Sequence, residues 1–131
     1  MKLFFPCLVS ISCLAAAPDP TRPVAEVLDT WHLAAARADE DQYFSLMTAD
    51  AVFLGTDATE RWTREEFRAW AHPHFAQGRA WSFRAGKRRV TLSRDQKTAW
   101  FDEELDTPNL GPARGTGVLV KEGKDWKIAH Y

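Results

Sequence analysis

Hydrophobic residues recur at helical spacing in the first half of the chain. Over residues 24–38, apolar side chains return every three or four positions and charged side chains occupy other positions; this pattern predicts an amphipathic helix. Asp39 with Gln42 three residues later predicts the start of a short second helix, because an Asp at this place accepts a hydrogen bond from a free backbone N–H. Thr63 and Glu66 form the same kind of signal and predict a third helix.

The pattern changes to that of strands on both sides of this third helix. An apolar stretch within residues 49–56 predicts a first strand, and we expect Pro73 to bend or end the helix that follows. After Gly78, β-branched and aromatic residues dominate and short runs of turn residues separate them. Four strands in meander order are therefore expected, within residues 81–93, 97–107, 113–123 and 125–131.

Helices first and strands later favour an α+β fold. We expect three N-terminal helices packed in a strongly curved antiparallel sheet. Such a sheet makes the molecule cone-shaped, and its open end is a natural place for a central pocket.

The first 17 residues differ in composition from the rest of the chain. One positive charge precedes an apolar run over residues 3–14, too short to span a membrane, and small residues follow it. We therefore predict a signal peptide over residues 1–17, a flexible leader over 18–23 and one domain over 24–131, in a secreted or periplasmic protein. A lipoprotein anchored at Cys13 is the alternative.

Charge and histidine spacing argue against several other functions. The chain has 17 Lys and Arg against 18 Asp and Glu, which does not favour binding to nucleic acid, and an alternating strand would divide the basic cluster at residues 84–89 between two faces. His72 and His74 are separated by Pro73 and lack a third ligand at a recognisable spacing, so we predict no metal and no other cofactor. His32 lies off the apolar stripe of its helix, and we expect it to be exposed.

The order of these elements, together with residues 43–67, 99–120 and 125–131, resembles the SnoaL-like group of the nuclear transport factor 2-like superfamily. The resemblance covers residues 24–131 and implies a ketosteroid isomerase-like cone. The superfamily includes isomerases, dehydratases, cyclases and transport adaptors, so the resemblance implies the fold more firmly than the activity.

The resemblance also argues against steroid isomerisation. Matched to ketosteroid isomerase, this chain has Trp31 where that enzyme has its Tyr and Gly55 where it has its carboxylate base. Thr116 stands near the position of the protonated Asp. Neither an indole nor a glycine can do the chemistry of the residue it replaces.

Glu60 and Trp62 follow the first strand and stand two residues apart. An extended segment would turn both toward one side, together with Ala58 where it reaches back that far. A carboxylate beside an indole in a dry pocket is suited to acid or base work. The alternatives are that Glu60 binds backbone amides of its own loop or pairs with Arg114.

Glu103 and His130 are the other polar candidates for the pocket. Alternation along residues 97–107 places Glu103 on the more apolar face, where it needs a partner such as Arg114. This pair is either structural or presents Arg114 to a substrate carboxylate or enolate. His130 alternates with Trp126 and Ile128, and it is either a proton-transfer group or a hydrogen-bonded core histidine.

Glu60 and His130 are therefore the catalytic candidates. The predicted pocket residues are Trp31, Tyr43, Glu60, Trp62, Trp81, Phe101, Glu103, Arg114, Thr116 and His130.

Two functions fit these features. The first is an exported protein that binds a small apolar molecule with a polar end and either only holds it or catalyses proton transfer, isomerisation or dehydration; the residues leave open whether it is an enzyme. The second is a non-enzymatic dimeric interaction or adaptor module whose cavity is filled by side chains. In both cases we expect a homodimer through the sheet face.

Overall fold

The computed structural model describes residues 16–108 and 110–131. The predicted signal peptide, including Cys13, lies outside the described residues except for Ala16 and Ala17. None of the helices in the described part of the chain is long and apolar enough to cross a membrane.

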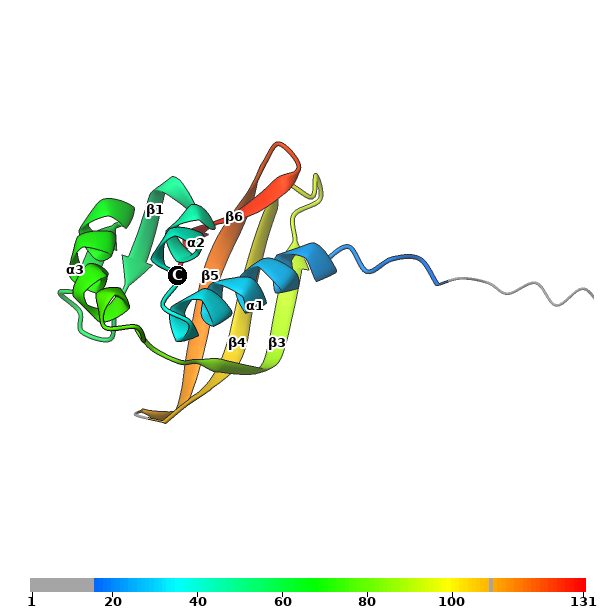
Figure 1. Ribbon diagram of the computed structural model, residues 1–131. Helices are drawn as coiled ribbons and strands as arrows, with labels where there is room; N and C mark the ends of the chain where they lie inside the picture. The colour runs from blue at the N-terminus through cyan, green and yellow to red at the C-terminus, as the bar shows by residue number, and fades with distance from the viewer. Residues whose placement is uncertain (1–15, 109) are drawn as a thin grey trace, which may run out of the picture.

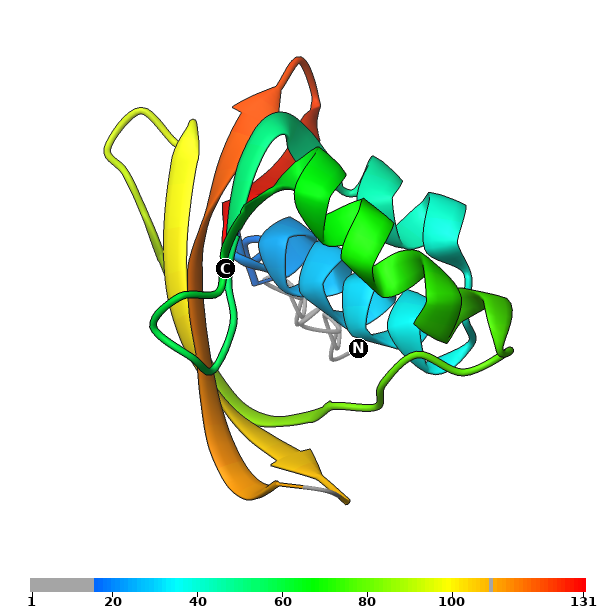
Figure 2. The ribbon, with the colours of Figure 1, turned by 90° about the vertical axis from the view of Figure 1, so that its left-hand side faces the viewer.

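Three helices lie against the concave side of one curved, unclosed sheet (Figure 1 and Figure 2). The helices are α1 (Arg22–Ala36), α2 (Glu40–Ser45) and α3 (Arg64–Ala76). The strands are β1 (Met47–Leu54), β2 (Arg61–Thr63), β3 (Arg84–Leu92), β4 (Thr98–Thr107), β5 (Gly111–Glu122) and β6 (Asp125–His130). Their order in the sheet is β2-β1-β6-β5-β4-β3, and the predicted α+β cone is confirmed.

The sheet is mixed rather than purely antiparallel. Four of the five strand pairs are antiparallel, as expected, but β1 pairs with β6 in parallel. The chain reaches this arrangement because it passes through β2, α3 and the β3–β5 meander before β6 returns beside β1.

The predicted helix caps are present. The Asp39 side chain accepts a hydrogen bond from the backbone N–H of Gln42, at 3.0 Å. The capping box of α3 is complete, with Glu66 accepting from the backbone N–H of Thr63 at 2.8 Å and Thr63 accepting from that of Glu66 at 3.3 Å. Each cap satisfies N–H groups that the first helical turn leaves unpaired.

Helix α3 continues through Pro73 to Ala76, so the proline does not end it at once. A proline inside a helix removes one backbone hydrogen bond. In the last turn the Phe75 ring is buried against Tyr43 and Phe44 at centroid distances of 5.4 and 6.1 Å, and the backbone N–H of Gln77 bonds to the carbonyls of this turn.

Two β-bulges change which side chains face the helices. In β3, Ala85 pairs with Leu105 but Arg88 pairs with Glu103, so one extra residue is inserted and Arg88 turns inward. In β6, Ile128 pairs with Leu119 but His130 pairs with Val118. Because Leu119 is buried on the inner face, this second bulge sends His130 to the outer face and the next residue inward.

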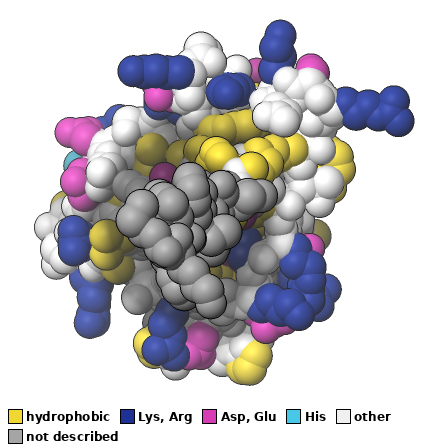
Figure 3. Space-filling model, turned by 90° about the vertical axis from the view of Figure 1, so that its right-hand side faces the viewer, with side chains coloured by type: hydrophobic (Ala, Val, Ile, Leu, Met, Phe, Trp, Pro, Cys, Tyr) yellow, Lys and Arg dark blue, Asp and Glu magenta, His cyan; other side chains and the backbone are white. Residues whose placement is uncertain are grey.

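The basic cluster at residues 84–89 is divided between the two faces of β3, as expected, although the bulge rather than simple alternation decides that Arg88 faces inward while Arg84 and Arg89 face outward. Arg84 and Arg89 lie on the outside and form ion pairs with Asp106 and Asp102 at 2.7 and 2.9 Å. Figure 3 shows one face of the molecule, on which the visible Lys and Arg side chains are spread out and interspersed with Asp and Glu.

Candidate functional site

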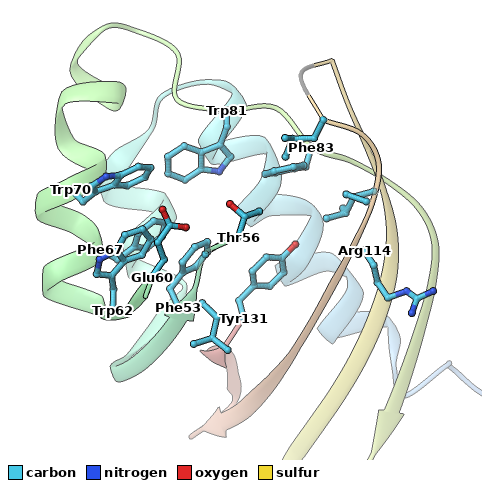
Figure 4. A pocket seen from close by; sticks show the side chains of 15 residues that line it. Phe53, Thr56, Glu60, Trp62, Phe67, Trp70, Trp81, Phe83, Arg114 and Tyr131 are labelled. Carbon is cyan, nitrogen blue, oxygen red and sulfur yellow. The ribbon is translucent and has the colours of Figure 1, made fainter. Parts of the chain in front are cut away.

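A pocket of about 440 Å³ opens between the β1–β2 loop, α3, the segment that follows α3 and the ends of β4 and β5 (Figure 4). This volume lies in the usual range for small-molecule sites. Its wall is mostly aromatic and aliphatic. The lining residues are Phe53, Leu54, Gly55, Thr56, Glu60, Trp62, Phe67, Trp70, Trp81, Phe83, Leu105, Leu110, Ala113, Arg114 and Tyr131.

Near-parallel aromatic rings form one wall of this pocket. The rings of Phe53 and Phe67 stack at 3.8 Å with an angle of 10° between their planes. Trp62 lies 5.6 Å from Phe67 and 5.1 Å from Trp70, at 12° and 24°. The arrangement follows from the fold, because antiparallel pairing sets Phe53 opposite Trp62, and residues 67 and 70 are neighbours on the surface of α3.

Glu60 brings a carboxylate into this aromatic pocket. The loop that carries it is closed by a hydrogen bond from the backbone N–H of Gly55 to the carbonyl of Glu60, at 2.8 Å. Its Oε2 accepts from the backbone N–H of Asp57 at 3.1 Å, and Figure 4 shows the carboxylate directed into the cavity. A Cβ at position 55 would lie 2.1 Å from Oε2, so a glycine is what leaves room for this carboxylate.

Both expected alternatives for Glu60 can be compared with this geometry. The bond to a backbone amide of its own loop is present. An ion pair with Arg114 is absent from the described residues. Glu60 therefore keeps acceptor capacity facing the pocket, since a carboxylate can accept several hydrogen bonds and one is used here.

Tyr131 connects the pocket to a buried polar cluster. Its ring lines the pocket, and its hydroxyl donates to Oε1 of Glu103 at 3.3 Å. The same carboxyl oxygen lies 2.7 Å from Nε2 of His32, and Nε of Arg88 donates to Oε2 at 2.7 Å. Arg88 also donates to Asp29 at 2.8 Å, so a chain of polar groups runs from the pocket wall to α1.

The cluster keeps Glu103 ionised and Tyr131 protonated. Burial alone would raise the pKa of Glu103, but its interactions with His32 and Arg88 outweigh this and lower the pKa below its usual range. Burial raises the pKa of the Tyr131 phenol, and the Glu103 carboxylate raises it further. The Tyr131 proton is thus held in the bond to Glu103, which leaves the lone pairs of its oxygen as hydrogen-bond acceptors.

Glu103 is fully buried, as alternation predicted, but its expected partner is wrong. Arg114 is exposed and lies opposite Glu104 on the outer face of the sheet, whereas Glu103 lies opposite Gly115 and Arg88. The prediction that His32 is exposed is also wrong: the residue is 6% exposed, because α1 turns this side toward β4 and the ring binds Glu103.

The structure brings only part of the predicted site together. Glu60, Trp62 and Trp81 line the pocket as a group. Arg114 contributes to the rim, but Figure 4 shows its guanidinium pointing away from the cavity.

Three other predicted pocket residues belong to the hydrophobic core. Trp31, Tyr43 and Phe101 are at most 2% exposed and are absent from the pocket wall. Trp31 stacks on Tyr43 at 4.6 Å, which places both rings behind the wall rather than in it.

Thr116 and His130 lie on the outer face of the sheet, away from the pocket. The predicted pocket included Thr116 and Arg114, which share one face of β5, but this face points outward. The inner face needs the glycines at positions 115 and 117, since a Cβ there would collide with the Tyr131 hydroxyl at 2.3 Å and with the His130 carbonyl at 2.2 Å. The bulge in β6 turns His130 outward.

Sequence reasoning missed Tyr131 and three rings of the aromatic wall, Phe53, Phe67 and Trp70. Tyr131 could not be found by strict alternation, because the bulge reverses its direction. The spacing of residues 67 and 70 on one helix face was a usable signal for the two rings of α3.

No group of three or more His, Cys, Asp or Glu side chains is placed to hold a metal ion in residues 16–108 and 110–131. His72 instead binds Glu40, with Nδ1 2.7 Å from Oε2.

Helices enclosed by a curved sheet, with a pocket at its open end, define a nuclear transport factor 2-like (NTF2-like) fold. Solved structures share this fold. An NTF2-like protein of unknown function from Shewanella oneidensis is 15% identical with a TM-score of 0.68, over 86% of this chain and 96% of that one. A protein from Novosphingobium aromaticivorans, provisionally named a scytalone dehydratase, is 9% identical with a TM-score of 0.70, over 84% and 79%.

A third similar structure comes from Xanthomonas campestris and is provisionally named a calcium/calmodulin-dependent protein kinase II association domain. It is 23% identical with a TM-score of 0.62, over 94% of each chain. No curated protein matches the sequence.

The model of the SnoaL-like domain family matches residues 24–131. The chain therefore belongs to this family, and the resemblance noted in the sequence is confirmed.

Proposed function

We propose that this is an exported protein that binds a small molecule with a flat, apolar body in the aromatic pocket. We further propose that Glu60 exchanges a proton with the bound molecule, in an isomerisation or dehydration. The observation that carries the proposal is the Glu60 carboxylate, which points into an aromatic cavity and forms no ion pair within the described residues.

The geometry supports proton transfer by Glu60 in three ways. The hydrogen bond from the Asp57 backbone amide fixes the carboxylate without using both oxygens. The neighbouring indoles reduce its contact with water and so strengthen its interactions with a ligand. In an isomerisation the same carboxylate can remove a proton from one atom of the ligand and return it to another, so no further reactant is needed.

The Tyr131 hydroxyl would act as a positioning group in this reaction. Its proton is shared with Glu103, so its oxygen can accept a hydrogen bond from the ligand. The Glu103 cluster with His32 and Arg88 holds the phenol in place and would orient the ligand relative to Glu60.

Native mass spectrometry of the protein, purified gently from the compartment where it accumulates, is the first test of binding. A defined adduct that is lost on denaturation supports the proposal and identifies the ligand. The same spectrum tests export, because removal of the signal peptide would leave a chain that starts close to residues 15–17 and has the correspondingly lower mass. It also gives the oligomeric state, which tests the predicted homodimer.

Proton transfer is tested with the released ligand in deuterated water. We expect the wild-type protein to replace a carbon-bound hydrogen of the ligand with deuterium, which NMR detects. In Glu60→Gln the rate of this exchange should fall at least about 100-fold, while the affinity for the ligand changes much less. Glu65→Gln is the control, because Glu65 is an exposed acid nearby on α3. Equal exchange by wild type and Glu60→Gln would contradict the role of Glu60 and leave binding intact.

The alternative function is an interaction module whose cavity is filled by side chains. The cavity of about 440 Å³ favours ligand binding over this alternative. The exposed Trp100 on the outer face of the sheet is compatible with a dimer contact there, which the mass of the native protein tests.

A further inference from the structure

Among the described residues, the ionisable groups that line the pocket are few, and they do not all point into it. They are Glu60, Tyr131 and Arg114. Arg114 is exposed and its guanidinium points away from the cavity (Figure 4). The Tyr131 hydroxyl is turned toward Glu103, which leaves Glu60 as the one charged group directed into the cavity by the described residues.

The Glu60 carboxylate also has few hydrogen-bond donors for a group that a bound ligand would bury. Its one side-chain hydrogen bond within the described residues comes from the Asp57 amide, at 3.1 Å. The residue is half-buried against Gly55, and the lining residues beside it are aromatic. Burying a carboxylate further under a ligand is costly unless the ligand supplies a positive charge or strong donors.

The indole rings also favour a positively charged ligand. Trp62, Trp70 and Trp81 all line this cavity, and Figure 4 shows the Glu60 carboxylate directed toward the side where Trp70 and Trp81 lie. The face of an indole carries partial negative charge and attracts cations, above all ammonium groups that are only partly hydrated. A carboxylate and indole faces together favour a positively charged ligand over a neutral or an anionic one.

We propose that the pocket binds an organic monocation, with a flat aromatic body on the ring wall and a protonated amine or quaternary ammonium group beside Glu60. This inference rests on the proposed function of the cavity as a small-molecule site. It adds the charge of the ligand, which the proposed function leaves open. The Tyr131 oxygen also favours a ligand with hydrogen-bond donors, such as a protonated amine, because it can accept but not readily donate a hydrogen bond.

Three probes that differ mainly in charge test this proposal by isothermal titration calorimetry at pH 7 and physiological salt. They are 2-naphthylmethylammonium, 2-naphthylmethanol and 2-naphthoate. We expect the ammonium to bind about 10- to 100-fold more tightly than the alcohol, the usual gain from a hydrogen bond to a charged group, and the carboxylate to bind most weakly.

Two variants connect the preference to Glu60. In Glu60→Gln the ammonium should lose its advantage and bind within about threefold of the alcohol, whose affinity stays near that in wild type. Gly55→Ala gives an independent check, because a Cβ at that position would occupy the place of the carboxylate and displace it. Glu65→Gln should change none of the three affinities, and thermal melting confirms that each variant is folded.

The outcomes separate this proposal from the proposed function. If the alcohol or the carboxylate binds as tightly as the ammonium, and Trp70→Ala weakens that binding, the cavity is a small-molecule site but not a cation site. If the ammonium retains its advantage in both Glu60→Gln and Gly55→Ala, the assignment to Glu60 is wrong. If none of the probes binds, the cation proposal fails together with binding of flat aromatic molecules in this pocket.

Discussion

Replacing Arg88 with Met should destabilise the protein far more than the same change at Arg89, one residue further along β3. Arg88 is 10% exposed and holds Glu103, which is fully buried, through a 2.7 Å hydrogen bond. Its removal leaves a buried carboxylate without its arginine, a change that usually costs about 3–5 kcal/mol. Arg89 pairs at 2.9 Å with Asp102 on the surface, where both side chains are about half exposed, and its loss should cost less than about 1 kcal/mol.

The size of this difference should depend on pH. In the wild type the lowered pKa of Glu103 contributes stability above the pKa of the unfolded chain, about 4.3, and this stability is lost as the pH falls through the folded value. In Arg88→Met burial of Glu103 remains while one of the interactions that lower its pKa is gone. Protonation then relieves the unpaired charge, so the deficit relative to wild type should shrink as the pH falls from 7 toward 4.

Urea denaturation of both variants at pH 7, 5.5 and 4.5 measures these free energies of unfolding. A third variant, Arg88→Met with Glu103→Gln, should recover part of the loss at pH 7, because the amide carries no charge. Equal losses for Arg88→Met and Arg89→Met, or a deficit that grows as the pH falls, would refute the buried charge cluster as the source of stability.

Two further substitutions test the packing and the capping. Gly115→Ala places a Cβ 2.3 Å from the Tyr131 hydroxyl and should lower the free energy of unfolding by about 1–3 kcal/mol, measured by urea denaturation. Gly86→Ala is the control and should change it little, because the nearest neighbour of its Cβ would be at 3.6 Å. Thr63→Ala removes one half of the capping box with Glu66 and should cost about 1 kcal/mol in the same denaturation assay, with no effect on ligand affinity.

Local signals in the sequence were enough for the elements and for the fold. The caps at Asp39 and Thr63, the period of α1 and the alternation in β4 each depend on residues close together in the chain. These signals, with the family resemblance, predicted the cone correctly. The inward direction of Glu103 was also local, because alternation within one strand determines it.

The partners of Glu103 could not be predicted in this way. Which arginine meets it depends on the register between strands; Gly86 within the β3 bulge is a known kind of bulge signal, but a glycine does not determine which neighbouring arginine turns inward. The same holds for His130 and Tyr131, which exchange faces at the bulge in β6. The face of β5 with Arg114 and Thr116 points outward because the inner face needs space at Gly115 for a ring from another strand.

Pairing β1 with β6 delays completion of the sheet while the protein is being made. Residues 47–52 can pair with β6 only after residues 128–130 have been synthesised, and before that β1 has only the three-residue β2 as a partner in the sheet. The hairpins β3–β4 and β4–β5 can form earlier, because their partners are consecutive in the chain. In pulse-labelling hydrogen exchange during refolding, we therefore expect amides of β4 and β5 to be protected first, and those of β1 to gain protection together with β6.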